Sequence, residues 1–386
     1  MEEQNKKKKI TKSGLVLTLV FLAVVIFLTG WNFDRFVSLL KADLPGITPE
    51  NVIWRTGSWN TAYTEYFRFR EPLIDLYGVV NLGLDKKSLD NFTLLKDSEN
   101  KMQSTQEGFD RLHAEEAVMI LSESFAQRGI PLLFVSEPPR VTEESFPVSA
   151  EVHFFGSRDP EFLRALTESG VDVLEAASEG EVALKTDMHL TTAAEMDVAR
   201  QIAEWLKRQG IDYRDDDLIF DLANYDAASH LFYGNLVKSS GRYYTLGGDD
   251  FELLYPRFET DFTIDNPEGN IERRGDFRHS LMNGMEDQLE INANPYWVLD
   301  YLQYPSARYT ITNHKQEGGC KILYVMDSVA MRTAAYLALG AGEVTVIDPR
   351  GANGNALLIE AMNTGDYDAV IVEGGGQDFY FTMNLY

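Results

Sequence analysis

The stretch that decides the fold is Lys321-Ile322-Leu323-Tyr324-Val325-Met326-Asp327-Ser328. Its continuous apolar run predicts a strand that is buried on both faces, as in a parallel sheet. The helical spacing of residues 329–339, closed by Gly340, predicts a helix directly after it. Ser328 then lies at a strand-to-helix turn, where backbone N–H groups and the helix dipole stabilise negative charge. A serine there suits a nucleophile, and an N-cap is the simpler alternative.

Strands alternate with helices on both sides of this stretch. The expected strands are 129–135, 171–174, 321–326, 343–347 and 368–372, and the expected helices are 108–127, 162–169, 193–209, 329–339 and 353–362. This alternation predicts an α/β fold with a doubly wound parallel sheet. Ligands of such sheets bind beyond the carboxyl ends of the strands, which is where Ser328 is expected.

A second stretch, Lys185-Thr186-Asp187-Met188-His189-Leu190-Thr191, carries an acid and a base. Side chains two residues apart in extended chain point to the same side, so Asp187 and His189 can contact each other or a common partner. Thr192 and Glu195 have the spacing of a capping box, which predicts that a helix begins here. The alternative is a surface turn without catalytic meaning.

The two stretches together resemble the DHHW and AlgJ/AlgX-type proteins, the SGNH-hydrolase-like extracytoplasmic components of polysaccharide O-acetylation systems. The second stretch is similar to their Thr-Asp-x-His-Trp-Thr motif, and Val325–Ser328 is similar to their later Gly-Asp-Ser-like segment. Tyr66–Ile74 is similar to a Phe-Pro-Phe-Arg-Asp segment of the same family. The order Asp, His, Ser also matches, and the resemblance covers residues 58–386. Leu190 and Met326 depart from the family, which has Trp and Gly at these positions.

The resemblance implies an SGNH-hydrolase-like fold and a catalytic triad without a cofactor or metal. Ser328 would be the nucleophile, His189 the base and Asp187 the residue that orients His189. The implied reaction transfers an acetyl group to hydroxyls of a polysaccharide, and a separate polytopic membrane O-acyltransferase would supply that group. An acetyl-esterase with the same triad is one alternative. A non-catalytic polysaccharide-binding partner is another, favoured by the two departures.

Three further residues are candidates for contact with the substrate. Gly234 permits a close backbone approach, and Asn235 can donate to an oxyanion, although a Gly-Asn pair also suits an ordinary turn. Arg350, after the strand 343–347, is a weaker candidate substrate contact.

Residues 212–320 interrupt the alternation of strands and helices. Short aromatic runs that alternate with polar residues predict a β-rich insertion near the catalytic edge of the sheet. Residues 85–105 show no clear period, so an exposed excursion is expected there.

The N-terminus has the pattern of a signal anchor. Residues 1–13, the predicted cytoplasmic tail, contain five lysines, and an apolar segment follows over 14–33. That segment is long enough to cross a bilayer, lacks a small-residue cleavage site and has lysines on its cytoplasmic side. Residues 34–57 would form a juxtamembrane linker and 58–386 an extracytoplasmic domain.

Composition narrows the classes of partner. The chain of 386 residues has a formal net charge of −25, which argues against nucleic acid or another anionic polymer as a tightly bound partner. Its single cysteine, Cys320, excludes an intramolecular disulfide and a cysteine-based zinc site.

Overall fold

The computed structural model describes residues 69–89, 94–104, 110–139, 158–267, 271–282 and 307–374, and the single positions 22, 23, 26, 27, 30, 383 and 385. The chain divides into two compact units, residues 1–79 and 80–386, and the fold below belongs to the second. Helix α3 (Arg70–Gly83) begins in the first unit and ends in the second.

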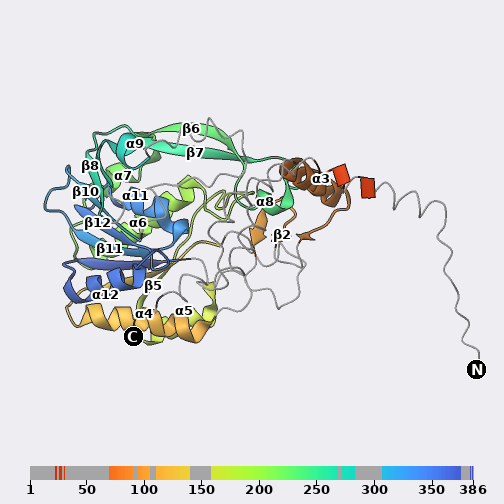
Figure 1. The fold of residues 1–386 in the computed structure, drawn as a ribbon. Coiled ribbons are helices and arrows are strands. Elements are labelled where there is room, and N and C mark those ends of the chain that lie inside the picture. Colours follow the sequence, from red (N-terminus) through yellow and green to blue (C-terminus); the bar gives the residue numbers. More distant parts are fainter. Residues whose placement is uncertain are drawn as a thin grey trace, which may run out of the picture. The chain divides into compact units, whose positions relative to one another are not determined.

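An eight-stranded mixed sheet forms the centre of the second unit (Figure 1). Its strands, in spatial order, are β5 (Asp172–Glu175), β4 (Leu132–Ser136), β13 (Ala369–Glu373), β11 (Lys321–Met326), β12 (Glu343–Ile347), β10 (Arg308–Asn313), β8 (Phe262–Asn266) and β9 (Ile271–Gly275). The first five are parallel, and the last three extend the sheet in antiparallel pairing. The predicted α/β class with parallel strands is therefore confirmed for five strands.

The sheet separates two hydrophobic cores, and β11 contributes side chains to both of them. Its side chains alternate, with Ile322, Tyr324 and Met326 in one core and Leu323 and Val325 in the other. The helices α6 (Thr192–Arg208) and α11 (Met331–Leu337) cover the first face, and α4 (Arg111–Ala126), α5 (Pro160–Glu168) and α12 (Gly354–Thr364) cover the second (Figure 1). A strand buried on both faces needs apolar side chains at every position, which explains the unbroken apolar run.

The helix predicted over 329–339 is shorter than expected. A 3₁₀ turn (Ser328–Ala330) comes first, and α11 follows it. The Asp327 carboxylate accepts a hydrogen bond from the N–H of Val329 at 2.9 Å and so caps the tight turn. Asp327 thus takes the N-cap role that was the alternative for Ser328.

The region 212–320 does not form one separate β-rich body in the described residues. Strands β8, β9 and β10 join the central sheet, whereas β6 (Tyr225–Phe232) and β7 (Asp249–Pro256) form a two-stranded sheet of their own. The short helical segments of this region are α7 (Asp216–Ile219), a 3₁₀ turn (Leu222–Asn224), α8 (Val237–Ser240) and α9 (Phe277–Ser280).

The exposed excursion expected at residues 85–105 is wrong. Strands β1 (Ser88–Leu89), β2 (Leu94–Lys96) and β3 (Met102–Ser104) form a small antiparallel sheet, and its apolar side chains pack against Leu236, Val237 and Tyr244. Lys96 is buried with them because its Nζ donates to the Tyr244 carbonyl at 2.9 Å and lies 3.9 Å from the centre of the Tyr244 ring. A buried lysine concealed this strand from the sequence pattern.

No helix among the described residues is long and apolar enough to cross a bilayer. Five positions of the predicted anchor at 14–33 are described, and all five are helical. The rest of that segment, together with the tail at 1–13 and the linker at 34–57, lies outside the described residues.

Glu373 is one of several carboxyl groups that the fold buries. Glu373 ends β13, is fully buried and accepts a hydrogen bond from the Tyr324 hydroxyl. Burial, reinforced by the charge of Glu137, raises the pKa of the Glu373 carboxyl well above its ordinary value, so the folded protein favours the protonated form of this group. In the unfolded chain the Glu373 carboxyl has its ordinary pKa of about 4.5 and loses its proton above that pH. Because the folded protein holds the proton more tightly, the free energy of unfolding falls as the pH rises above about 4.5.

We expect Glu373→Gln to remove this pH dependence, because Gln stays neutral and still accepts from Tyr324. The free energy of unfolding of the variant should match that of the wild type near pH 5 and exceed it at pH 8. Urea unfolding at both pH values tests this, with Glu272→Gln on the exposed face of β9 as a control for the same loss of charge. Equal pH dependence in the wild type and in Glu373→Gln would contradict the prediction.

Candidate active site

The loop before α6 brings the side chains of Asp187 and His189 together as expected, although residues 185–189 form bends and not extended chain. A β-bridge between Ala183 and Leu190 closes the loop, and the N–H of Thr191 donates to the Val182 carbonyl at 2.8 Å. The N-cap of α6 is Thr191, whose hydroxyl accepts from the N–H of Ala194 at 3.3 Å. The predicted capping box of Thr192 and Glu195 is therefore wrong by one position.

Asp187 and His189 form a direct pair. The carboxylate contacts the Nδ1 atom of the imidazole and also accepts from the backbone N–H of His189 at 3.0 Å. Burial alone would raise the pKa of the Asp187 carboxyl, but the His189 ring and the N–H groups of Asn235 and His189 lower it below its ordinary value. The carboxylate is ionised and can only accept, so the proton between the two side chains belongs to Nδ1.

Ser328 lies at the other nitrogen of the same ring. The Nε2 atom of His189 is 3.2 Å from the backbone oxygen of Ser328, and the Ser328 side chain is half-buried at the carboxyl end of β11. The imidazole therefore spans Asp187 and Ser328, which are 141 positions apart in sequence. In the neutral ring Nε2 carries a lone pair, and once protonated it can donate to the Ser328 carbonyl.

The segment with Gly234 and Asn235 lies directly against Asp187. The N–H of Asn235 donates to the second carboxylate oxygen of Asp187 at 2.6 Å, and the N–H of Gly234 donates to the Thr186 hydroxyl at 2.8 Å. Both backbone groups are thus engaged in holding the acid loop. The two backbone N–H groups are therefore occupied and are not available to an oxyanion. The side-chain amide of Asn235 takes part in neither of these two hydrogen bonds.

Asp249 is a residue of the site that the sequence did not reveal. It begins β7, and its buried carboxylate accepts from the N–H groups of Lys185 and Thr186 and from the Thr186 hydroxyl. Burial raises the pKa of the Asp249 carboxyl despite these hydrogen bonds. Asp249 thereby fixes the backbone just before Asp187, yet it lies 63 residues from Thr186 in sequence and has no spacing that would identify it.

Arg350 follows β12, which neighbours β11, but its guanidinium pairs with Asp348. The distances are 3.0 Å from Nε to Oδ1 and 2.8 Å from Nη2 to Oδ2. The described contacts do not bring Arg350 together with Asp187, His189 or Ser328.

Leu190 and Met326, the two departures from the family motif, are both core residues. Each is about 1% exposed and belongs to the core on the side of α6 and α11. The Met326 side chain is therefore directed into the core.

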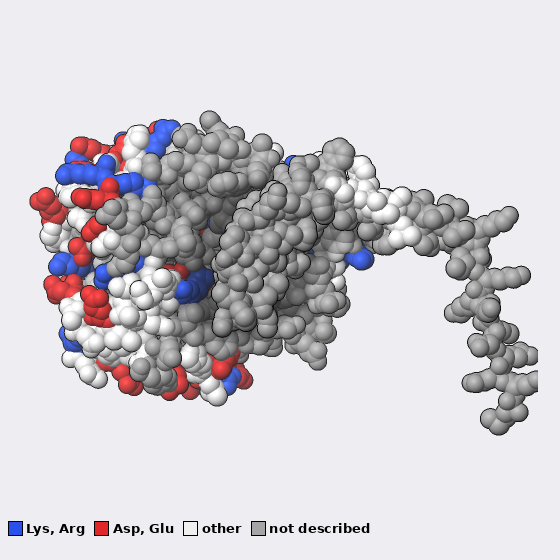
Figure 2. All heavy atoms as spheres, in the orientation of Figure 1, with Lys and Arg blue, Asp and Glu red and all other residues white. Residues whose placement is uncertain are grey.

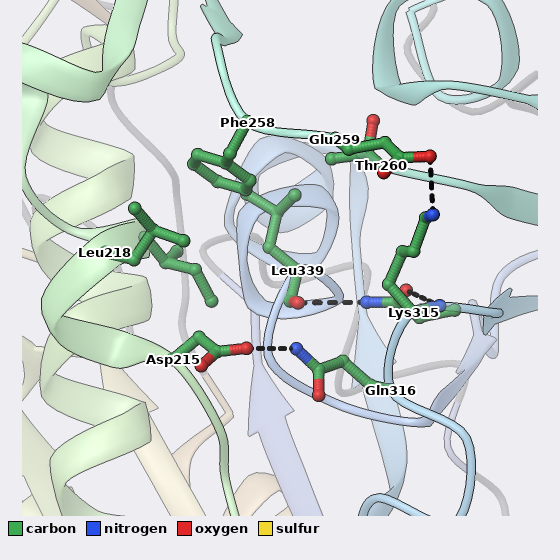
Figure 3. Close-up of a pocket in the computed structure, with 10 residues that line it drawn as sticks. Asp215, Leu218, Phe258, Glu259, Thr260, Lys315, Gln316 and Leu339 are labelled. Atoms are coloured by element: carbon green, nitrogen blue, oxygen red, sulfur yellow. Dashed lines mark hydrogen bonds and ion pairs between the residues drawn. The ribbon is translucent and has the colours of Figure 1, made fainter.

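A cavity of about 120 Å³ lies at the opposite end of the sheet (Figure 3). Its lining includes Asn313 at the end of β10, and this strand runs antiparallel to β12, so the cavity is at the amino ends of the parallel strands. Its polar side chains are paired with each other, Lys315 with Glu259 at 2.6 Å and Gln316 with Asp215 at 2.6 Å (Figure 3). This cavity is not part of the site around Ser328.

Charged side chains of both signs are interspersed over the described part of the face in Figure 2. The chain as a whole has a net charge of −25.

Comparison with solved structures identifies the fold. Bacillus cereus PatB1 with a sulfonyl adduct superimposes with a TM-score of 0.54 at 15% identity, covering 75% of this chain and 99% of PatB1. A DHHW family protein from Eubacterium siraeum superimposes with a TM-score of 0.50 at 12% identity, covering 75% of this chain and 94% of that protein. The O-acetyltransferase domain of Pseudomonas putida AlgJ matches with a TM-score of 0.41 at 14% identity, over 74% of this chain and 91% of that domain.

The chain therefore has the fold of PatB1 and of the DHHW family protein, and the resemblance found in the sequence is confirmed at the level of the fold. No family model matches the chain, and a search of curated proteins found no match.

The contact between Gly234 and Asp187 generates a test of the site's architecture. A Cβ atom on Gly234 would overlap the Cβ and Oδ2 atoms of Asp187 and lie 2.7 Å from its Cα. We expect Gly234→Ala to lower the free energy of unfolding by roughly 1–3 kcal/mol, because a tightly packed neighbour must move. The NMR resonance of the His189 Nδ1 proton should also shift or disappear.

Gly83→Ala in α3 is the matched control, since a Cβ there meets no atom within 4 Å. It should leave both the stability and the Nδ1 resonance close to those of the wild type. An unchanged Nδ1 resonance in Gly234→Ala would show that Gly234 does not hold Asp187.

Proposed function

We propose that the chain is an O-acetyltransferase that moves an acetyl group to hydroxyls of a cell-surface or secreted polysaccharide through an acetyl-enzyme. The observation that carries this proposal is the chain of contacts from Asp187 through both nitrogens of His189 to the backbone oxygen of Ser328, which brings the serine next to the imidazole. An acid, an imidazole and a hydroxyl in this order are the elements of nucleophilic acyl transfer.

The first half of the reaction forms the acetyl-enzyme. The Ser328 hydroxyl oxygen attacks the carbonyl carbon of the donor's acetyl group while His189 Nε2 takes the hydroxyl proton. The tetrahedral intermediate then expels the donor's oxygen, which receives that proton from Nε2, and the acetyl group stays on Ser328. In the second half, a sugar hydroxyl gives its proton to Nε2 and attacks the acetyl carbon. Ser328 leaves as an alkoxide and recovers the proton from His189.

Two contacts stabilise the charged imidazole that forms in each half. The ionised Asp187 carboxylate balances the positive charge and keeps the Nδ1 proton in place. The backbone oxygen of Ser328 can accept from Nε2–H at the distance observed, 3.2 Å. Both interactions are stronger with the imidazolium than with the neutral ring, so they favour proton transfer from the serine.

The side-chain amide of Asn235 is our candidate donor to the oxyanion. The N–H of Asn235 already holds Asp187, so the residue is fixed next to the triad. Gly234 allows this approach because it has no side chain. In this proposal Arg350 has no role at the reacting atoms, since its guanidinium pairs with Asp348.

The substrate class rests on the sequence resemblance together with the shared fold. The acceptor would be a polysaccharide, and the acetyl group would come from a polytopic membrane O-acyltransferase. The chain would be anchored in the cell membrane by residues 14–33, with its N-terminus cytoplasmic and its catalytic domain outside. No cofactor is required by the mechanism.

An acetyl-esterase is the second candidate, since hydrolysis needs the same triad. The half-buried position of the Ser328 side chain is compatible with attack by water as well as by a sugar hydroxyl. The identity of the acceptor in a direct assay separates the two activities.

The test is turnover of a chromogenic acetyl ester by the full-length protein with and without a bare oligosaccharide. We expect Ser328→Ala to reduce kcat by at least about 1000-fold, because the covalent route is lost. Ser169→Ala, at the exposed end of α5, is the control and should retain wild-type turnover.

Acetyl groups on the recovered oligosaccharide would support transfer, whereas release of free acetate alone would support the esterase. Absence of turnover in the wild type, with Ser328→Ala indistinguishable from it, would contradict both and favour a non-catalytic binding role. PatB1 is known with a sulfonyl adduct, which makes sulfonyl fluorides suitable reagents for a parallel test of Ser328.

A further inference from the structure

A buried ion pair connects the two helices that follow the triad segments. Arg332 lies four residues after Ser328, at the start of α11, and Glu195 lies in the first turn of α6, shortly after His189. Their side chains are 3% and 0% exposed, and the Nη2 atom of Arg332 is 2.5 Å from a carboxylate oxygen of Glu195.

Arg332 also contacts the histidine loop itself. Its Nη2 atom donates to the backbone oxygen of Leu190 at 2.6 Å, and Leu190 is the residue next to His189. Its Nη1 atom lies 3.5 Å from the Thr192 hydroxyl, and its guanidinium lies 5.1 Å from the centre of the Phe251 ring. The guanidinium therefore connects the helix after the nucleophile to the carbonyl next to the base.

An ion pair this deeply buried is a poor way to gain stability. The free energy lost when both charged groups leave water offsets much of the free energy gained from their attraction. Apolar residues of similar volume often stabilise the fold as well or better. Burial raises the pKa of the Glu195 carboxyl to about 7 even though Arg332 and His189 lower it. The directional hydrogen bonds of the guanidinium provide what apolar residues cannot, namely a fixed position for the Leu190 carbonyl relative to α11.

We propose that Arg332 and Glu195 are positioning residues that set the distance between His189 and Ser328. The inference rests on the proposed function, because it concerns the same nucleophile and base. Neither residue touches the reacting atoms. The pair acts by fixing the backbone on either side of the triad, where a displacement of about 1 Å lowers rates on the order of 100-fold.

The experiment measures covalent labelling of Ser328 by phenylmethanesulfonyl fluoride in the full-length protein, together with ester turnover and melting temperature. Labelling needs the nucleophile and base but no sugar acceptor. Arg332→Met and Glu195→Gln should each slow labelling on the order of 10- to 100-fold and lower kcat for the ester similarly, with KM within about twofold of wild type. Each single variant should also melt at a lower temperature, because a buried charged group loses its opposite charge.

The double variant Arg332→Met/Glu195→Leu separates positioning from stability. It should regain most of the melting temperature, since no buried charge is left, but it should still label slowly. Wild-type labelling by the stable double variant would overturn the proposal, because the pair would then be only structural. Wild-type labelling by both folded single variants would overturn it as well.

Tyr336→Phe is the matched control on the same helix. It removes a buried hydrogen bond of 3.1 Å to the Leu254 carbonyl, near the end of α11 that is opposite the Ser328 turn. This variant should lose melting temperature and still label Ser328 at the wild-type rate. Slow labelling by Tyr336→Phe would count against the proposal, because any weakening of α11 would then have the same effect. Failure of the wild type itself to label at Ser328 would overturn the proposed function and this inference with it.

Discussion

The structure around the site depends on one buried negative charge, the carboxylate of Asp187. Its side chain is 4% exposed, so its ionised form must be stabilised by neighbours rather than by water. Its contacts supply that stabilisation: the His189 ring on one oxygen and the N–H of Asn235 on the other. Each contact also fixes a segment of chain. The stabilisation of the carboxylate and the orientation of the imidazole therefore arise from the same set of hydrogen bonds.

The segments that meet at Asp187 come from different parts of the fold. The β7 strand contributes Asp249, which holds the backbone of Thr186. The loop between β6 and α8 contributes Gly234, whose missing side chain allows contact with Asp187. The small sheet β1–β3 supports the loop from the other side, through the hydrogen bond from Met102 N–H to the Lys185 carbonyl at 2.8 Å. The parallel sheet places Ser328 just beyond the end of β11, so that Ser328 and the loop of Asp187 meet at the carboxyl edge of the sheet.

The sequence predicted the parts of this arrangement that depend on local pattern. The apolar run of β11, the alternation of strands and helices and the pairing of Asp187 with His189 follow from periodicity within a few residues. Asp249, Arg332 and Glu195 could not be found in this way, because their partners lie far along the chain, 142 positions in the case of Arg332 and Leu190. The strands at 88–104 were missed for a related reason: buried Lys96 and Asp97 make a packed segment look exposed in sequence. The antiparallel extension by β8, β9 and β10 depends on a long-range pairing of β10 with β12 that no local pattern encodes.

At Leu190, where the family has Trp, the backbone oxygen and the side chain have different roles. At this position the described contacts use the backbone oxygen, which accepts from Arg332, and a side chain that fills the core beneath α6. A buried apolar side chain of another shape can fill that core if its neighbours adjust, whereas the carbonyl position is set by the bridge to Ala183 and by the guanidinium. Replacement of Trp by Leu therefore changes the packing under the loop but leaves intact the backbone contacts that orient His189. By the same reasoning, Met326 contributes its side chain to the core and its backbone to the pairing with Glu373 in β13, so neither departure removes a group that the Asp187–His189–Ser328 contacts require.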